Sequence, residues 1–374
     1  MGNVIIVGTD HYNTLWMVRC LGMVGFNPYV IIVSSKEHSF VAKSKYCSEC
    51  VLVDSNDSML SILLERDTEG KVPIFTSGDA IAKYLDNRLD LLSGKYILQN
   101  CNGKQGDLSY WMNKNNMLRL ASDCGLIIPL TRSFSTAQNI DCSQIPFPCL
   151  VKPELSAEAS KDNFRICNDA HEFEVALREI KDNCSRVIVQ EYIKSEYEYL
   201  VYGVSTNEGI CTPGGLRKIH VCTSNKNLGM LSYACLSSEL PPQIESFDKI
   251  DKFVRTLGYK GLFSVEFLIT KDKAYFLEIN LRNDGTCYIT AEAGVNMPAI
   301  WACSVMGLDS SHLSKTFKRE RTYGMNEINY IKYTLSIRSL LKCLKEVSKV
   351  NVFSIIRLED MRPFFFKIIY GLLY

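Results

Sequence analysis

The stretch Gly261-Leu-Phe-Ser-Val-Glu266-Phe-Leu-Ile-Thr-Lys-Asp272-Lys-Ala-Tyr-Phe-Leu-Glu278-Ile-Asn280-Leu-Arg282 decides the fold. Two apolar runs flank a polar turn, which predicts a β-hairpin. If the loop centres on Asp272, Glu266 lies directly across from Glu278, with Cβ atoms roughly 4.5–5.5 Å apart. The loop has no glycine, and a bulge that shifts this register by one residue is an alternative.

The polar side chains of this hairpin gather on one face, because Glu278, Asn280 and Arg282 alternate with apolar residues. Two opposed carboxylates repel each other unless a cation lies between them. Carboxylate and amide oxygens suit Mg²⁺, so we expect Glu266, Glu278 and Asn280 to bind a metal. Arg282 can hold phosphate or an oxyanion by a forked contact. An exposed polar hairpin face is the alternative, but the whole array favours a metal–phosphate site.

This array resembles the signature of the ATP-grasp superfamily. The resemblance implies that two acidic residues and an asparagine bind Mg²⁺, with Mn²⁺ as an alternative, and that Arg282 contacts the transferred group or the substrate. It also implies the activity of an ATP-dependent ligase. Such an enzyme activates a carboxylate as an acyl phosphate and couples it to an amine, or less readily a thiol, releasing ADP and phosphate.

Nucleotide contacts follow from the same resemblance. Lys114 opens a predicted helix that ends at Gly125, and Lys152 ends the apolar run Cys149-Leu-Val. Both are similar to the phosphate-contacting lysines of the family. Val187-Ile-Val-Gln-Glu-Tyr-Ile193 resembles the hinge between the lobes, which implies adenine contacts and a ribose contact. We assign the adenine contacts to Glu191, Tyr192 and Ile193, and the ribose contact to Glu198, with Glu196 as its competitor.

One segment departs from the family pattern. Residues 154–161, Glu-Leu-Ser-Ala-Glu-Ala-Ser-Lys, contain no glycine where the family carries a glycine-rich phosphate loop. Glycine's positive-φ conformations are therefore lost. A nucleotide-binding scaffold without ligase chemistry is the alternative hypothesis.

A basic strand is expected on the substrate side. Cys211-Thr-Pro-Gly-Gly-Leu-Arg217-Lys218-Ile-His220 is a glycine-rich turn that leads into it. Arg217 and Lys218 point to opposite faces of such a strand, and either is a candidate catalytic residue that neutralises a carboxylate substrate. A solvated basic edge is the alternative.

The rest of the chain predicts two kinds of fold. Residues 1 to about 100 alternate strand and helix signals, which predicts a Rossmann-like parallel sheet, although G-x-G-x-x-G is absent. From Pro148 onward strands dominate, in the pattern of an α+β protein with antiparallel pairs. The expected domains are an α/β domain (1–100), a small ATP-grasp lobe with a connecting helix (101–190), a large lobe with the metal site (191–310) and a basic helical extension (311–374).

Composition and charge narrow the class of protein, its partners and its cellular compartment. The 374 residues include 47% apolar and 22% charged residues, typical of a globular protein, and a net charge of +1 does not support a nucleic-acid partner. Fifteen scattered cysteines and no secretory signal predict reduced thiols in the cytoplasm. We expect small-molecule carboxylate and amine substrates.

The C-terminal tail has two interpretations. Ile337, Leu340, Leu341, Leu344 and Val347 fall at helical spacing among basic residues, and an aromatic run starts at Pro363. Contact with an anionic membrane surface is one interpretation. Docking onto the protein body or onto a second subunit of a homodimer is the favoured one.

Overall fold

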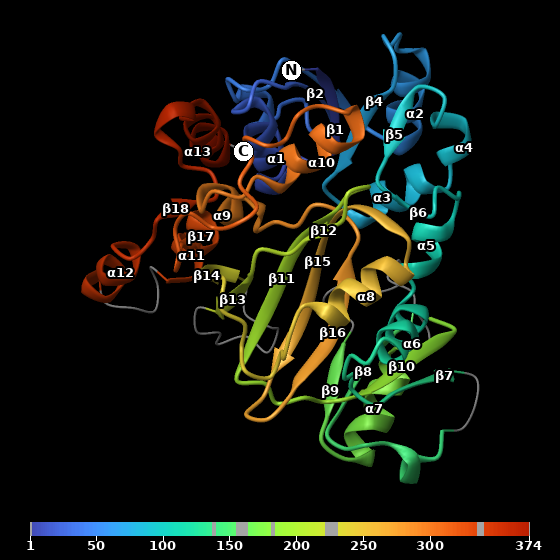
Figure 1. Cartoon of the computed structure of the whole chain (residues 1–374). Coiled ribbons are helices and arrows are strands. Elements are labelled where there is room, and N and C mark those ends of the chain that lie inside the picture. Colours follow the sequence, from blue (N-terminus) through green and yellow to red (C-terminus); the bar gives the residue numbers. More distant parts are fainter. Residues whose placement is uncertain are drawn as a thin grey trace.

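The computed structural model describes residues 2–136, 140–154, 164–180, 184–220, 231–334 and 340–373. Three sheets follow one another along the chain (Figure 1). The domain boundaries given above remain predictions. The glycine-free segment lies almost entirely outside the described residues, as do Ile337 and Arg338.

The first sheet is parallel, as the sequence predicts, with the order β3-β2-β1-β4-β5. Its strands are β1 (Asn3–Gly8), β2 (Asn27–Val33), β3 (Glu49–Val53), β4 (Val72–Thr76) and β5 (Tyr96–Leu98). Its helices are α1 (Tyr12–Gly22), α2 (Asn56–Glu65), α3 (Asp79–Asp86) and α4 (Leu89–Leu92), with a 3₁₀ turn η1 (Val41–Lys43). Helix α3 ends at Asp86, and α4 begins at Leu89.

The second sheet is antiparallel and small, with the order β7-β10-β8-β9. Its elements are β7 (Thr131–Ser135), β8 (Cys149–Pro153), β9 (Arg165–Cys167), β10 (Arg186–Glu191), the 3₁₀ turn η2 (Cys142–Gln144) and the covering helix α7 (Ala170–Ile180). Two helices precede it, α5 (Asp107–Trp111) and α6 (Lys114–Asp123).

The third sheet has nine strands, with a main path β16-β15-β11-β13-β14-β17-β18. Its strands are β6 (Asn100–Cys101), β11 (Tyr197–Ser205), β12 (Ile210–Cys211), β13 (Gly215–His220), β14 (Leu231–Ser237), β15 (Tyr259–Ile269), β16 (Ala274–Asn280), β17 (Tyr323–Met325) and β18 (Val352–Phe353). Helices α8 (Asp248–Thr256), α9 (Cys287–Glu292), α10 (Met297–Met306) and α11 (Glu327–Thr334) belong to this part.

The C-terminal part is not purely helical. It adds β17 and β18 to the large sheet, with α12 (Leu340–Val347) between them in the chain. The 3₁₀ turn η3 (Leu358–Asp360) and α13 (Arg362–Leu373) follow β18. No helix in the described ranges is both long enough and apolar enough to cross a bilayer.

The large sheet has a different core on each face. One face, with Leu200 and Tyr202, shares a core with α1, α9 and α10 of the neighbouring elements. Phe75 of the first sheet meets Trp301 of α10 with ring centroids 4.9 Å apart. The other face, with Val201, packs against α6 and α8. The first and third sheets are thus joined by one continuous core, which fixes α3 beside the end of β16.

Candidate active site

The hairpin of β15 and β16 places Glu266 opposite Glu278, as the sequence predicts. Ser264 pairs with Asn280 two positions further along. Paired residues lie on the same face of a sheet, so both carboxylates and the amide share one face. The Asn280 Nδ2 donates to Ser264 Oγ at 3.2 Å and to Glu266 Oε1 at 3.4 Å.

A β-bulge produces this register. Near the turn Phe267 pairs with Phe276, and the register shifts by one residue between Glu266 and Phe267. Leu277 is therefore the extra residue in β16. Without the bulge Leu277 would lie opposite Glu266, and Glu278 would point into the apolar core on the far face. The predicted pairing of Glu266 with Glu278 is confirmed, but the loop does not centre on Asp272, and the bulge restores the pairing instead of removing it.

Lys218 provides a positive charge on the same face. Its Nζ lies 2.6 Å from Glu266 Oε2 and 3.4 Å from Glu198 Oε2. Glu198 and Lys218 are cross-strand partners on β11 and β13. Burial acts to lower the pKa of Lys218, but the two carboxylates outweigh it and raise that pKa above its ordinary value. Lys218 is therefore a fixed cation at the edge of the carboxylate pair.

The ionised form of Glu266 is disfavoured despite its contact with Lys218. Burial raises the pKa of Glu266 to about 7, Lys218 opposes the rise, and the charges of Glu278 and Asp284 add to it. One lysine therefore leaves the group of acids undercompensated. A divalent cation between Glu266 and Glu278 would relieve both burial and repulsion.

Arg282 connects the hairpin to the first sheet. Its guanidinium forks onto Asp79, the first residue of α3, with Nε–Oδ1 2.7 Å and Nη2–Oδ2 3.2 Å. Its Nη2 also donates to Asn280 Oδ1 at 3.0 Å. Burial acts to lower the pKa of Arg282, but Asp79 outweighs it and raises that pKa. Arg282 thus stays charged beside Asn280.

Lys152 reaches the site from the second sheet. Its Nζ donates to Gln190 Oε1 at 3.3 Å. Burial lowers the pKa of Lys152 to about 8, the like charge of Lys114 acts in the same direction, and Glu278 opposes both. Lys114, Lys152 and Glu278 are therefore close enough to affect one another, although they come from α6, β8 and β16.

The start of α6 matches the prediction from sequence. Asn113 is its N-cap, and the Asn113 side chain accepts hydrogen bonds from the backbone N–H groups of Asn115 at 3.0 Å and Asn116 at 3.3 Å. The chain leaves the helix at Gly125, whose φ is +87°. Lys114 occupies the first helical position.

The predicted hinge begins within β10 and continues for two residues beyond it. The N–H of Glu191 donates to the Leu130 carbonyl at 2.8 Å, and the N–H of Tyr192 donates to the Pro148 carbonyl at 3.0 Å. The Glu191 carboxylate accepts from the Leu130 N–H at 3.2 Å. Among the described residues, the Ile193 N–H has no hydrogen-bond partner. Ile193 thus offers the one hinge N–H that is available to a base edge.

Arg217 is not brought into this site. It pairs with Tyr199 on the face of the sheet opposite to Lys218, and its guanidinium lies 4.1 Å above the Tyr197 ring. Strand alternation therefore selects Lys218 and corrects the expectation for Arg217.

Three site neighbours were not singled out from sequence. Asp79 lies 203 positions from its partner Arg282, and no local signal links them. Asp284 accepts from Ser264 Oγ at 3.4 Å. Asn283 is fully buried, and its amide contacts Asn13 of α1. Their roles depend on how the first and third sheets meet.

The side chains of the site could bind a magnesium ion if a nucleotide supplied some of the ion's remaining oxygen ligands. Within the described ranges, no group of three or more His, Cys, Asp or Glu side chains forms a metal site. Glu266, Glu278 and Asn280 offer two carboxylates and one amide, and Mg²⁺ commonly takes its remaining ligands from water and phosphate. The undercompensated charge of Glu266 is the observation that supports this fit.

Comparison with known proteins identifies the fold. Residues 234–329 match a family model described as ATP-grasp in the biosynthetic pathway with Ter operon. The formate-dependent phosphoribosylglycinamide formyltransferase of Ignicoccus hospitalis is 30% identical over 214 residues. That match covers 53% of this chain and 51% of the relative, so the chain spans about half the length of this curated relative.

Solved structures resemble a larger part of the chain. N5-carboxyaminoimidazole synthetase from Staphylococcus aureus, complexed with ADP, has a TM-score of 0.68 at 16% identity and covers 86% of this chain and 82% of its own. L-amino acid ligase from Bacillus licheniformis has a TM-score of 0.64 at 16% identity, covering 84% and 77%. The predicted fold class and the predicted resemblance are both confirmed.

Proposed function

We propose that this chain, an ATP-grasp protein, is an ATP-dependent ligase that forms carbon–nitrogen bonds. It activates a carboxylate as an acyl phosphate and couples it to an amine, with a thiol as the less favoured nucleophile. The observation that carries the proposal is the opposed pair Glu266 and Glu278 on one face of the sheet. The charge of Glu278 also acts on Lys152 of a different sheet.

Metal and phosphate binding would be divided between the sheets. Glu266, Glu278 and Asn280 would hold Mg²⁺, or Mn²⁺ in its place, which supplies the charge that neutralises the phosphates. Lys152 and Lys114 would contact the phosphates from the opposite side. Burial lowers the pKa of Lys152 to about 8, and a bound phosphate anion would stabilise its protonated form.

The nucleoside would lie along the hinge. The Ile193 N–H would donate to the adenine edge, with Glu191 and Tyr192 lining the same segment. Glu198 would accept from the ribose hydroxyls. Its 3.4 Å contact with Lys218 orients the carboxylate toward the site face.

The chemical step follows from these positions. A substrate carboxylate oxygen attacks the γ-phosphorus of ATP, and the bond to the β-phosphate oxygen breaks to release ADP. Arg282 would steady the acyl phosphate, and Lys218 would neutralise charge at the reacting carboxylate. An amine then attacks the acyl carbon, the amine proton passes to solvent, and phosphate leaves.

The cellular compartment of the reaction and the oligomeric state are also proposals. Cys20, Cys101, Cys287 and Cys303 are buried free thiols, which supports a reducing compartment such as the cytoplasm. We also propose that the chain forms a homodimer.

Hydroxylamine trapping tests this function. The protein, Mg²⁺ and ATP are incubated with a library of carboxylic acids and hydroxylamine, and hydroxamate and ADP are measured together. We expect at least one acid to yield hydroxamate and ADP in equal amounts, and Glu278→Gln to abolish both. Nucleotide binding without ADP release for any acid and amine would instead support a scaffold without ligase chemistry.

A further inference from the structure

Helix α13 packs onto the protein body with one face. Phe364 and Phe366 contact the core that joins the first and third sheets. Lys367 Nζ lies 4.0 Å above the Phe40 ring, and the rings of His38 and Tyr370 are 5.1 Å apart. The favoured interpretation of the tail, docking onto the body, thus describes this inner face.

The outer face of α13 is also apolar and is exposed. Phe365, Ile368 and Ile369 are 56%, 41% and 52% exposed, and their spacing puts them on one stripe. Arg362 lies on the same stripe and is exposed. A helix that is apolar on both sides is usually covered on both sides.

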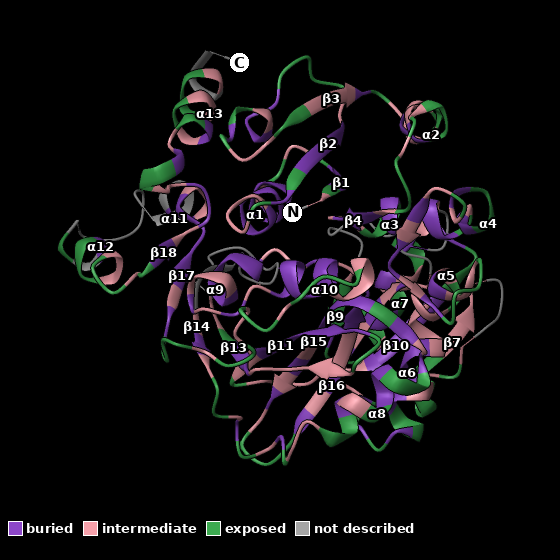
Figure 2. Cartoon of the chain, turned by 45° about the horizontal axis from the view of Figure 1, so that its top comes forward, coloured by how far each residue is buried: buried purple, intermediate pink, exposed green. Residues whose placement is uncertain are grey.

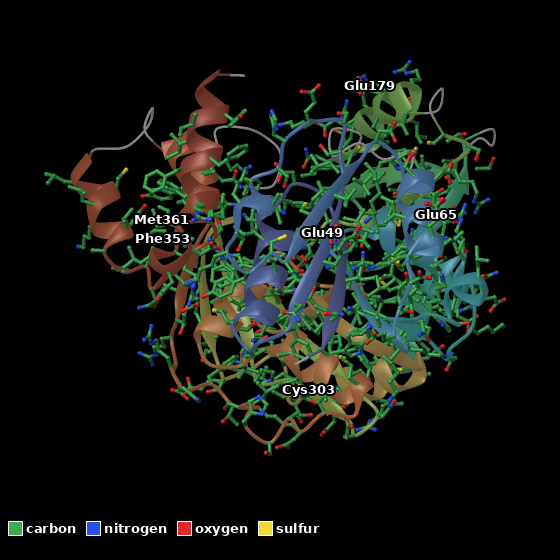
Figure 3. The ribbon with its side chains drawn as sticks, turned by 90° about the horizontal axis from the view of Figure 1, so that it is seen from above. Glu49, Glu65, Glu179, Cys303, Phe353 and Met361 are labelled. Atoms are coloured by element: carbon green, nitrogen blue, oxygen red, sulfur yellow. The ribbon has the colours of Figure 1, made fainter. Side chains whose placement is uncertain are left out.

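Further exposed apolar side chains lie close in sequence. Leu341 and Leu344 of α12 are 80% and 58% exposed, and Leu358 is 87% exposed. The described residues contain fourteen exposed large apolar side chains. Six of the fourteen, counting the α13 stripe, lie in residues 340–373, the last 34 residues that the structure describes. Figures 1 and 2 place α12 and α13 along one edge of the molecule, and Figure 3 shows the same edge from above near Phe353 and Met361.

Charge distinguishes this edge from the rest of the chain. Residues 340–373 contain six Lys and Arg and three Asp and Glu, whereas the whole chain has a net charge of only +1. The three acids are all engaged, by Arg19, by Arg357 and by the Tyr330 hydroxyl. In the described part of the chain, Lys345, Lys349 and Arg362 are exposed and make no ion pair.

We propose that this edge binds the surface of an anionic lipid bilayer, with α13 lying in the interface plane. The exposed stripe would enter the headgroup–acyl boundary, and the basic residues would contact lipid phosphates. Twelve residues span about 18 Å, which is too short to cross the hydrocarbon core of about 30 Å. A symmetric second copy fits less well, because it would bring together two copies of an edge that carries net positive charge.

Vesicle co-sedimentation of the full-length chain tests the proposal. Vesicles of phosphatidylcholine alone are compared with vesicles containing about one-third phosphatidylglycerol, at low and high salt. We expect binding to the anionic vesicles only, and partial release by salt. Ile368→Gln with Ile369→Gln should weaken partition at least about tenfold. Arg362→Gln should weaken it about fivefold.

Matched control variants distinguish binding by this edge from nonspecific adsorption of the protein to vesicles. Leu91 of α4 is 58% exposed, as is Leu344, so Leu91→Gln should leave partition unchanged while Leu344→Gln weakens it. Lys71→Gln serves as the control for charge. Because the altered side chains are exposed, the fold should be preserved, which circular dichroism checks.

Two outcomes would overturn the proposal. One is equal sedimentation with and without anionic lipid. The other is a dimer in analytical ultracentrifugation that the Ile368 and Ile369 changes convert to a monomer without any vesicle binding. The proposal does not depend on the ligase function, since ADP release by the same variants in the absence of lipid should match that of the unaltered chain.

Discussion

At the scale of single residues, the site is organised by Glu266, a carboxyl whose anion is poorly compensated. Folding raises its pKa from about 4.3 in the unfolded chain to about 7, because burial and the neighbouring acids outweigh Lys218. A raised carboxyl pKa means that the folded chain favours the proton. The contribution of Glu266 to stability therefore falls as pH rises from about 4.3 to about 7.

Metal binding should reverse that preference. Mg²⁺ needs the carboxylate form of Glu266, so we expect the affinity for Mg²⁺–ADP to be about tenfold weaker at pH 6 than at pH 8. Titration calorimetry at several pH values measures this. ADP without metal should lack the trend, and an equally strong trend in Glu266→Gln would contradict the assignment. Glu245→Gln, an exposed acid before α8, is the control.

Lys152 gives a prediction of opposite sign, because phosphate binding favours its protonated form, whereas metal binding favours the deprotonated form of Glu266. Burial lowers its pKa to about 8, and phosphate binding should raise it again. ADP binding at pH 8 should therefore take up about half a proton. Calorimetry in two buffers of different ionisation enthalpy detects the uptake, and Lys152→Gln should remove it. Proton release at this pH, or uptake that persists in the variant, would place the titrating group elsewhere.

At the scale of elements, the ends of helices and the register of the hairpin carry the site. Asn113 caps α6 through two backbone N–H groups and so holds Lys114 in the first turn. Asn113→Ala should lower the free energy of unfolding by about 1 kcal/mol. Urea denaturation tests this, and Asn113→Ser should retain most of the stability. A loss of equal size in both variants would rule out a capping role.

Local sequence predicted many of these elements because their signals are local. Alternation in β16, the Asn113 cap and the Gly125 stop are each encoded within a few residues. Helix α10 was not predicted, since it lies between two sheets and is apolar around much of its surface, which removes the helical periodicity. The bulge at Leu277 restores the Glu266–Glu278 pairing, and that role was not predicted, because it depends on the turn that the chain selects.

At the scale of the whole molecule, contacts between distant segments complete the structure. Arg19 of α1 and Asp360 near the C-terminus form an ion pair, Nε–Oδ2 2.9 Å, with neither side chain exposed. Asp360 also accepts from Ser44 Oγ at 2.7 Å and from the Lys45 N–H at 2.9 Å. The pair fastens the end of the chain to its first helix.

Removing one member of this pair should be costly. Asp360→Ala leaves Arg19 buried and uncompensated, so we expect unfolding to become easier by about 3–5 kcal/mol. Glu359→Ala, at an exposed neighbour, should change stability by less than about 0.5 kcal/mol. Thermal and urea unfolding of both variants test this, and equal stabilities would show that the pair contributes little.

Contacts between segments that are distant in the sequence also explain which parts of the site could not be predicted. The carboxylate pair was predictable, since both strands belong to one hairpin. The Asp79–Arg282 fork, the approach of Lys152 to Glu278 and the exclusion of Arg217 depend on how three sheets meet. No pattern within a short window encodes those contacts.

Mn²⁺ binding in the presence of ADP, measured by electron paramagnetic resonance, tests the central claim most directly. Mn²⁺ takes the place of Mg²⁺ in oxygen-ligand sites. We predict one nucleotide-dependent Mn²⁺ site in the unaltered chain, lost in Glu266→Gln and in Glu278→Gln and kept in Glu245→Gln. Unchanged Mn²⁺ binding in both site variants would contradict the account.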